Sequence, residues 1–229
     1  MRANAKIIAI EGIDGSGKSI QSKLLALRLR ADNLQVAEFS FPNYDSPTGT
    51  KIAEYLNGKL GNVETFNSYE AARLFTLDRV AVKDDIKAAI KNSDVVIMNR
   101  YVISNLAHQG YRITDETQRH AFYNMILNDE HGIHGLPPAD CNIILYVPTK
   151  IAQTLIDKKD DRSHLEGKKR DEHEDSISHL NGAADAYTEL ANWLPKTRVI
   201  TINCAPHGEL LKVREITELI YNKVKTLLN

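Results

Sequence analysis

The sequence predicts an α/β fold in which a five-stranded parallel sheet is covered by helices on both faces. Five short runs are rich in Ile and Val, and they are mostly continuous rather than alternating, as is typical of strands buried on both faces. Helical stretches separate these runs, and a regular alternation of strand and helix favours parallel pairing. The length of 229 residues, with 42% hydrophobic and 26% charged side chains, fits one hydrophobic core, so we expect residues 1–229 to form a single domain.

The first predicted strand, Lys6–Glu11, contains the uninterrupted apolar run Ile7–Ile10. The later strands have a similar composition, rich in β-branched residues. They are Gln35–Phe41, Asp94–Met98, Asn142–Val147 and Arg198–Asn203.

The helices are predicted from apolar residues that recur at helical spacing, such as Ile20, Leu24 and Leu27 in the first of them. The last helix carries an apolar stripe made of Leu210, Val213, Ile216, Ile220 and Val224. The predicted ranges are Ser19–Ala31, Ser46–Asn57, Ser68–Lys91, Thr114–Asn128, Lys150–Lys159, Glu174–Trp193 and His207–Leu228. Residues 157–175 are almost all charged, and we expect them to form a mobile, solvated segment within the domain.

Charge and hydropathy exclude several classes of partner. With 29 basic and 30 acidic residues, the formal charge of -1 gives no overall field that would attract nucleic acid or a membrane surface. The longest apolar runs, such as Ile143–Val147, are far shorter than the roughly 20 residues that span a bilayer, and Met1–Lys6 lacks the apolar core of a signal peptide. Cys141 and Cys204 stand in no metal-binding or disulfide pattern. We therefore expect a cytoplasmic protein that binds neither nucleic acid nor membranes and has two reduced core cysteines.

The most specific motif is the octapeptide Gly12–Ser19, which matches G-x-x-x-x-G-K-[ST] in full and lies between a predicted strand and a predicted helix. Glycines let the backbone wrap around an anion, and the N–H groups at the start of the helix bind phosphate. Lys18 would neutralise the β- and γ-phosphates, and Ser19 would offer its hydroxyl to Mg²⁺. The fold is therefore predicted to be of the P-loop NTPase type. The predicted ATP-binding residues are Gly12, Ile13, Asp14, Gly15, Ser16, Gly17, Lys18 and Ser19. GTPases, ATPases and kinases all remain open at this point.

Several segments in the same order resemble the thymidylate kinase family, from Lys6 to about Leu190. They are Glu11–Ser19, Phe41–Tyr44, Leu74–Arg79, Asn99–Asn105, Ala107–Gly110 and Leu136–Asp140. The resemblance implies an enzyme that transfers the γ-phosphoryl group of ATP to dTMP to give dTDP, uses Mg²⁺ and forms a homodimer.

The resemblance also implies a dTMP site. Phe75 would stack on thymine, Arg79 would hydrogen-bond a carbonyl of the base, and Arg100 would hold the acceptor phosphate. The implied dTMP-binding residues are Asp14, Phe41, Pro42, Tyr44, Phe75, Arg79, Arg100, Ser104, Asn105, His108 and Tyr187, and the implied metal-binding residues are Ser19 and Asp14. Structural alternatives stay open: Phe75 as a core residue, Arg79 as a partner of Asp78 or Asp84, Arg100 in a surface salt bridge, and His108 as a hydrogen-bonded structural histidine.

Catalysis by such an enzyme depends on positioning and on positive charge around the transferring group. The candidate catalytic residues are Lys18, Arg100, Asp14, Arg162 and Arg170. Family members carry a catalytic arginine either in the P-loop or in a lid. Since the P-loop here has none, the resemblance implies that the basic segment Arg162–Arg170 supplies it, with Glu174 a weaker site candidate at the exit from the lid.

Three positions depart from the family pattern: Asn99 replaces an aspartate, Asn43 replaces a basic residue, and His108 replaces an aromatic residue, often tyrosine. Two alternative functions are kept. A deoxynucleoside kinase would need a carboxylate base beside the sugar, commonly as Glu-Pro after the second strand, where this chain has Phe41-Pro42. A nucleotide-binding module with reduced catalysis would explain Asn99 and Asn43.

Overall fold

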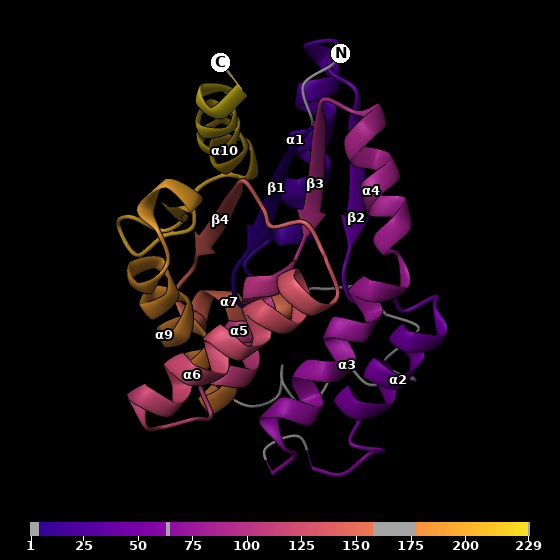
Figure 1. Ribbon diagram of the computed structural model, residues 1–229. Coiled ribbons are helices and arrows are strands. Elements are labelled where there is room, and N and C mark those ends of the chain that lie inside the picture. The colour runs from indigo at the N-terminus through magenta and orange to yellow at the C-terminus, as the bar shows by residue number, and fades with distance from the viewer. Residues whose placement is uncertain (1–4, 63–64, 158–176, 229) are drawn as a thin grey trace.

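A computed structural model describes residues 5–62, 65–157 and 177–228 (Figure 1). The candidates Arg162, Arg170 and Glu174, and nearly all of the charged segment 157–175, lie outside the described residues.

The core of the molecule is a parallel five-stranded sheet with the order β2-β3-β1-β4-β5. The strands are β1 (Lys6–Glu11), β2 (Val36–Ser40), β3 (Val95–Asn99), β4 (Cys141–Tyr146) and β5 (Val199–Asn203). Ile8 and Ile10 of β1 are fully buried, because β1 lies between β3 and β4 with helices above and below. Ser40 and Ile10 both pair with Asn99, so the ends of β2, β3 and β1 meet at one edge of the sheet. The predicted fold class is confirmed.

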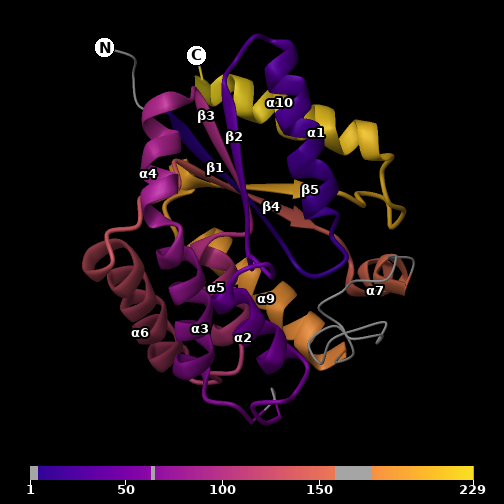
Figure 2. The ribbon, with the colours of Figure 1, turned by 90° about the vertical axis from the view of Figure 1, so that its right-hand side faces the viewer.

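Helices cover both faces of the sheet, as Figure 2 shows: α1 and α10 lie on one side, and α4, α5 and α9 on the other. The α-helices are α1 (Lys18–Ala31), α2 (Pro47–Leu56), α3 (Ser68–Ala81), α4 (Lys83–Asn92), α5 (Val102–Gly110), α6 (Glu116–Leu127), α7 (Thr149–Asp157), α9 (Ile177–Trp193) and α10 (Val213–Leu228). A π-helical turn, η1 (Asn128–Ile133), follows α6, and a 3-10 turn, η3 (Lys196–Arg198), precedes β5. Helices α3, α5 and α9 pack side by side and surround the site described below.

Two helix predictions were wrong in extent, and one helix was not predicted. The helix predicted over Ser68–Lys91 is divided at Val82, whose φ of -112° and ψ of 18° leave the helical region. The last helix begins at Val213 rather than His207. Helix α5 was not predicted, and all nine of its residues are buried, including the polar face formed by Ser104, Asn105, His108 and Gln109.

No described helix is long and apolar enough to cross a bilayer. Cys141 and Cys204 are free and buried in the core, as expected. The described residues contain no group of three or more His, Cys, Asp or Glu side chains that could hold a metal ion by themselves.

Candidate active site

The octapeptide Gly12–Ser19 forms the turn between β1 and α1. Gly12, Gly15 and Gly17 have φ values of 136°, 79° and 85°, which L-residues rarely adopt. A Cβ atom on Gly15 would lie 2.1 Å from the carbonyl oxygen of Ala152, so the neighbouring chain also excludes a side chain there. Gly17 occupies the N-cap of α1, so this helix starts with free N–H groups that face the loop. The loop therefore has the geometry of a phosphate-binding site.

The Lys18 side chain lies along this loop and is only 6% exposed. Its Nζ atom donates a hydrogen bond to the carbonyl oxygen of Ile13 at 2.7 Å, which keeps the ammonium group over the loop. Such a position lets a phosphate bind at the charge without a large side-chain movement.

Asn99, at the end of β3, reaches the P-loop serine. Its Nδ2 atom donates to Ser19 Oγ at 3.1 Å and to Ser40 Oγ at 2.8 Å. Its Oδ1 atom is buried without a partner among the described residues. Magnesium prefers oxygen ligands and often binds through retained waters, so Ser19 Oγ fits as a ligand of the ion, while Asn99 turns its Nδ2 atom towards this hydroxyl. The other predicted metal-binding residue, Asp14, is ion-paired with Arg100 in this structure, and its role at the metal stays a prediction.

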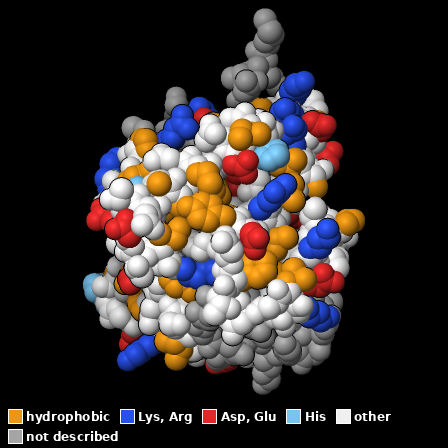
Figure 3. Space-filling view, turned by 60° about the horizontal axis from the view of Figure 1, so that its bottom comes forward, with side chains coloured by type: hydrophobic (Ala, Val, Ile, Leu, Met, Phe, Trp, Pro, Cys, Tyr) orange, Lys and Arg blue, Asp and Glu red, His pale blue; other side chains and the backbone are white. Residues whose placement is uncertain are grey.

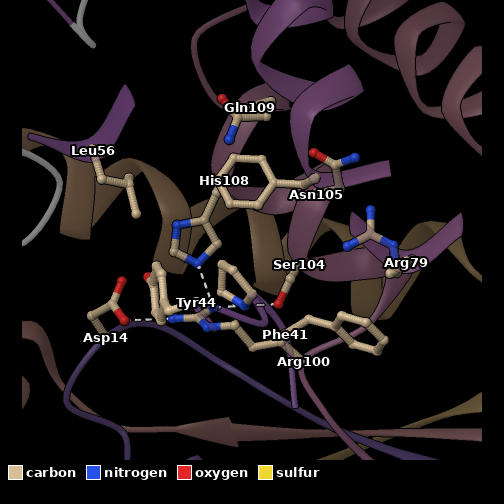
Figure 4. A pocket seen from close by; sticks show the side chains of 12 residues that line it. Asp14, Phe41, Tyr44, Leu56, Arg79, Arg100, Ser104, Asn105, His108 and Gln109 are labelled. Carbon is tan, nitrogen blue, oxygen red and sulfur yellow. Dashed lines mark hydrogen bonds and ion pairs between the residues drawn. The ribbon is translucent and has the colours of Figure 1, made fainter. Parts of the chain in front are cut away.

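An open pocket adjoins the loop (Figure 4). It brings together every predicted dTMP-binding residue except Tyr187, and it adds two residues that were not predicted to bind dTMP, Leu56 and Gln109. The lining residues are Asp14, Phe41, Pro42, Tyr44, Leu56, Phe75, Arg79, Arg100, Ser104, Asn105, His108 and Gln109. The Tyr187 hydroxyl lies behind this wall, 2.9 Å from Ser104 Oγ.

The apolar wall of the pocket is formed by Phe41, Pro42, Leu56 and Phe75. Phe75 packs edge-on against Tyr55 with ring centroids 6.2 Å apart, while one side of its own ring lines the pocket. Phe75 thus packs against a core residue and also lines the pocket, and its contact with a ligand stays a prediction.

The turn after β2 is attached to α3 by Asp78, which is 1% exposed. Asp78 accepts hydrogen bonds from the backbone N–H of Asn43 and from Thr48 Oγ1, each at 2.8 Å, and from Ser46 Oγ at 3.2 Å. This carboxylate therefore holds the turn that carries Phe41, Pro42 and Tyr44 against the helix that carries Phe75. The alternative in which Arg79 pairs with Asp78 is therefore not observed.

Arg79 is instead paired with Glu130 on η1, and both side chains are buried. Arg79 Nε donates to Glu130 Oε2 at 2.6 Å and Nη2 donates to Oε1 at 2.5 Å. Burial alone would lower the pKa of Arg79, but the charge and hydrogen bonds of Glu130 outweigh it and raise that pKa. Among the described residues, Nη1 is paired with no acceptor, and Arg79 lines the pocket. No sequence pattern pointed to Glu130, because it lies 51 residues away from its partner.

Asn105 and Gln109 lie one turn apart on α5 and present unpaired polar atoms. Asn105 Nδ2 donates to Ala72 O at 3.0 Å and to Glu130 Oε1 at 3.2 Å, while its Oδ1 has no partner among the described residues. Gln109 Oε1 accepts from Arg112 Nη2 at 2.7 Å, which leaves Nε2 without a described partner. Both residues line the pocket, and each has one buried polar atom that is paired with no other described atom.

Arg100 projects into the pocket from the end of β3 and joins it to the P-loop. Its Nη2 donates to Asp14 Oδ1, and its Nη1 lies 3.4 Å from Gly12 O, 3.3 Å from Ser104 Oγ and 3.0 Å from His108 Nε2. Burial would lower the pKa of Arg100, but Asp14 opposes this effect and the pKa is raised, so the guanidinium stays charged. The pocket thus places a fixed cation beside the phosphate-binding loop.

His108 is a neutral member of this cluster. Burial and the adjacent Arg100 hold the pKa of His108 well below its ordinary value. Since a guanidinium only donates, His108 Nε2 accepts the hydrogen bond from Arg100, and its Nδ1 faces His179 Nε2 at 3.0 Å. His108 is thus hydrogen-bonded as a structural histidine would be, and it also lines the pocket.

A phosphate-binding loop at the edge of a parallel sheet, with an arginine-lined pocket beside it, defines a P-loop phosphotransferase. The family model described as thymidylate kinase matches residues 10–213. The chain therefore belongs to the thymidylate kinase family, whose ATP-dependent reaction converts dTMP to dTDP, and it is an enzyme of this class.

Similar proteins agree with this assignment. The chain is 32% identical over 186 residues to a thymidylate kinase of Mycobacterium tuberculosis, covering 81% of this chain and 85% of that protein. It is 31% identical over 149 residues to a thymidylate kinase of Wolbachia pipientis wMel, and this match covers 63% of this chain and 68% of that protein. A solved structure of thymidylate kinase from Candida albicans superimposes with a TM-score of 0.74, and the match covers 99% of this chain and 94% of that one. The sequence identity is 22%, so this likeness shows the fold alone.

Proposed function

We propose that the pocket binds dTMP with its phosphate at Arg100 and its base along Phe75, and that the P-loop binds ATP as the phosphoryl donor. The observation that carries this proposal is the position of Arg100, whose guanidinium lies 3.4 Å from the carbonyl oxygen of Gly12 in the P-loop. A phosphate held by Arg100 would lie next to phosphates held by the loop. Proximity of this kind supplies a large part of the catalysis of phosphoryl transfer.

The unpaired polar atoms of the pocket support a thymine or uracil base. The edge of such a base presents an acceptor, the N3–H donor and a second acceptor. Arg79 Nη1, Asn105 Oδ1 and Gln109 Nε2 would supply a donor, an acceptor and a donor in return. A cytosine base has an amino group and an unprotonated N3 on the same edge, so two of the three pairings would fail and leave buried polar atoms unpaired.

The acceptor needs no general base in this reaction. A phosphate with a second pKa near 6 is largely deprotonated at neutral pH. Lys18 and Arg100 would stabilise the charge that spreads over the transferring group. Magnesium held near Ser19 and Asn99 would supply further positive charge at the phosphates. Arg162 and Arg170 remain candidates for an additional catalytic cation.

The proposal is tested by a coupled ADP-release assay with ATP, Mg²⁺ and each of dTMP, dUMP, UMP, dCMP and thymidine. We expect rapid turnover of dTMP, slower turnover of dUMP and none of dCMP or thymidine. Lys18→Ala should lower kcat at least about 100-fold, while Lys23→Ala, which changes an exposed lysine of the same helix, should not. ATP binding without turnover of any acceptor would instead indicate the nucleotide-binding module with reduced catalysis.

We also propose that the enzyme is a homodimer, as the family resemblance implies. Exposed apolar side chains on α3 and α6 support this: Tyr69, Leu77 and Met125 are 45%, 38% and 40% exposed. On the face in Figure 3, hydrophobic side chains gather in patches between charged ones. Light scattering after size exclusion should give twice the chain mass of 25.7 kDa, and Leu77→Glu should shift the mass towards the monomer. A monomeric mass of the unmodified protein at micromolar concentration would contradict the proposal.

A further inference from the structure

Glu11, the last residue of β1, is a fully buried carboxylate that lies outside the pocket. It accepts three hydrogen bonds. The backbone N–H of Tyr101 donates to Oε1 at 2.8 Å, Ser104 Oγ donates to Oε2, and the Tyr187 hydroxyl donates to Oε2 at 3.1 Å. A buried carboxylate is costly unless it is paired in this way, so its presence calls for an explanation.

The first hydrogen bond fixes the backbone next to Arg100. Arg100 has a φ of 65°, a left-handed conformation that costs a non-glycine residue energy. Two consecutive backbone N–H groups attach this residue to β1. The N–H of Arg100 donates to Ile10 O at 3.0 Å, and the N–H of Tyr101 donates to Glu11. Glu11 thus stabilises the backbone turn that aims the Arg100 side chain at the pocket.

The Glu11 carboxylate also caps the N-terminus of helix α5, although Glu11 itself belongs to strand β1. Tyr101 is the N-cap residue of α5, and Ser104 is the third residue of the helix. In a capping box, an acidic residue at that third position accepts the N-cap N–H. Here the helix has serine at that position, and Glu11 supplies the carboxylate from β1. Its negative charge also suits the N-terminus of a helix.

The second hydrogen bond orients the guanidinium itself. Because the Ser104 hydroxyl donates its proton to Glu11, its oxygen can accept from Arg100 Nη1 at 3.3 Å. Tyr187 of α9 closes the cluster, since its hydroxyl lies within hydrogen-bonding distance of both Glu11 and Ser104. Glu11 therefore acts on Arg100 by two routes: it holds the adjacent backbone through the N–H of Tyr101, and it orients the Ser104 hydroxyl that contacts the guanidinium.

We propose that Glu11 is a positioning residue, which holds Arg100 in the conformation that binds the acceptor phosphate. This inference rests on the proposed function of Arg100. Glu11 does not line the pocket, and besides these two routes its charge attracts the nearby Arg100.

The test compares Glu11→Gln with the unmodified enzyme by steady-state kinetics and by calorimetric titration with dTMP. Glutamine keeps the size and one acceptor but replaces the second oxygen by a donor. We expect KM and Kd for dTMP to rise at least tenfold while KM for ATP stays within twofold. Glu38→Gln, the same chemical change at a partly exposed position of β2, should alter none of these values.

A double-mutant cycle separates positioning from a general structural role. If Glu11 acts partly through Ser104, Glu11→Gln should raise KM for dTMP by a smaller factor when Ser104→Ala is already present. Equal increases in KM for dTMP and ATP, or a lower melting temperature with unchanged KM, would each overturn the proposal. If the unmodified enzyme neither binds nor phosphorylates dTMP, the proposed function falls first and the inference falls with it.

Discussion

At the scale of single residues, the pocket joins a flat apolar surface to a small number of unpaired polar atoms. Phe75 supplies the flat surface, and Arg79, Asn105 and Gln109 supply the polar atoms. This separation suggests that affinity depends mainly on stacking and selectivity mainly on hydrogen bonds.

Phe75→Ala should therefore raise KM for dTMP by about 10- to 100-fold, as expected for the loss of about 1.5–3 kcal/mol of aromatic burial. The KM for ATP should not change, because the P-loop is formed by other elements. Steady-state kinetics with each substrate varied in turn measure both values. An unchanged KM for dTMP would mean that Phe75 only packs against Tyr55.

Asn99 is the residue whose chemistry differs most from the family resemblance. Asn99→Asp should keep or raise activity and lower the Mg²⁺ concentration that gives half-maximal rate, because a carboxylate 3.1 Å from Ser19 Oγ attracts the ion and its waters. A Mg²⁺ titration of the rate provides the measurement. If activity instead collapses in the variant, the amide is part of a different metal-site design.

At the scale of elements, α3 and the turn after β2 behave as one unit because of Asp78. The sequence predicted α3 but not this attachment, since the bonded residues lie 30 to 35 positions apart. Helix α5 was also missed: it is only nine residues long, and its polar face is buried towards the pocket rather than exposed to solvent.

Asp78→Ala should release the turn that carries Phe41, Pro42 and Tyr44. We expect a loss of about 1–3 kcal/mol of unfolding free energy, because buried donors lose their acceptor, and a higher KM for dTMP. Denaturant unfolding and kinetics measure these effects. Asp84→Ala on α4, outside the pocket lining, is the matched control and should change neither quantity.

At the scale of the whole molecule, buried titratable groups tie stability to pH. Burial raises the pKa of Glu11 above 4.5, so the folded protein binds a proton there at pH values where the unfolded chain has lost it. The contribution of Glu11 to the free energy of unfolding therefore falls as the pH rises from about 4.5 through the folded-state pKa. Burial lowers the pKa of His179 to about 4, so this histidine has the opposite effect: it destabilises the fold as the pH falls.

Comparison of the unmodified enzyme with Glu11→Gln isolates the contribution of the glutamate, because His108 and His179 are present in both. The melting temperature of the variant minus that of the unmodified enzyme should increase from pH 4.5 to neutral pH. A difference that is constant over this range would show that Glu11 has an ordinary pKa in the fold. If Glu11→Gln melts at a higher temperature at neutral pH and also binds dTMP more weakly, then Glu11 lowers the stability of the fold while it supports dTMP binding.

The sequence by itself determined the sheet and the P-loop, and its resemblance to the thymidylate kinase family implied most of the pocket residues. These features depend on local information: continuous β-branched runs, glycines at fixed spacing before a helix, and short motifs at the ends of strands. The ends of parallel strands meet at one edge, so motifs that follow β1, β2 and β3 had to converge.

Only the tertiary structure decided which groups hold those residues in place. Glu130 pairs with Arg79, Asp78 holds the turn after β2, and Glu11 caps α5, in each case across 30 or more positions of the chain. The physical reason is that a buried charge is stable only where packing brings donors to it, and packing is a property of the folded chain. Local sequence patterns therefore do not predict these long-range contacts.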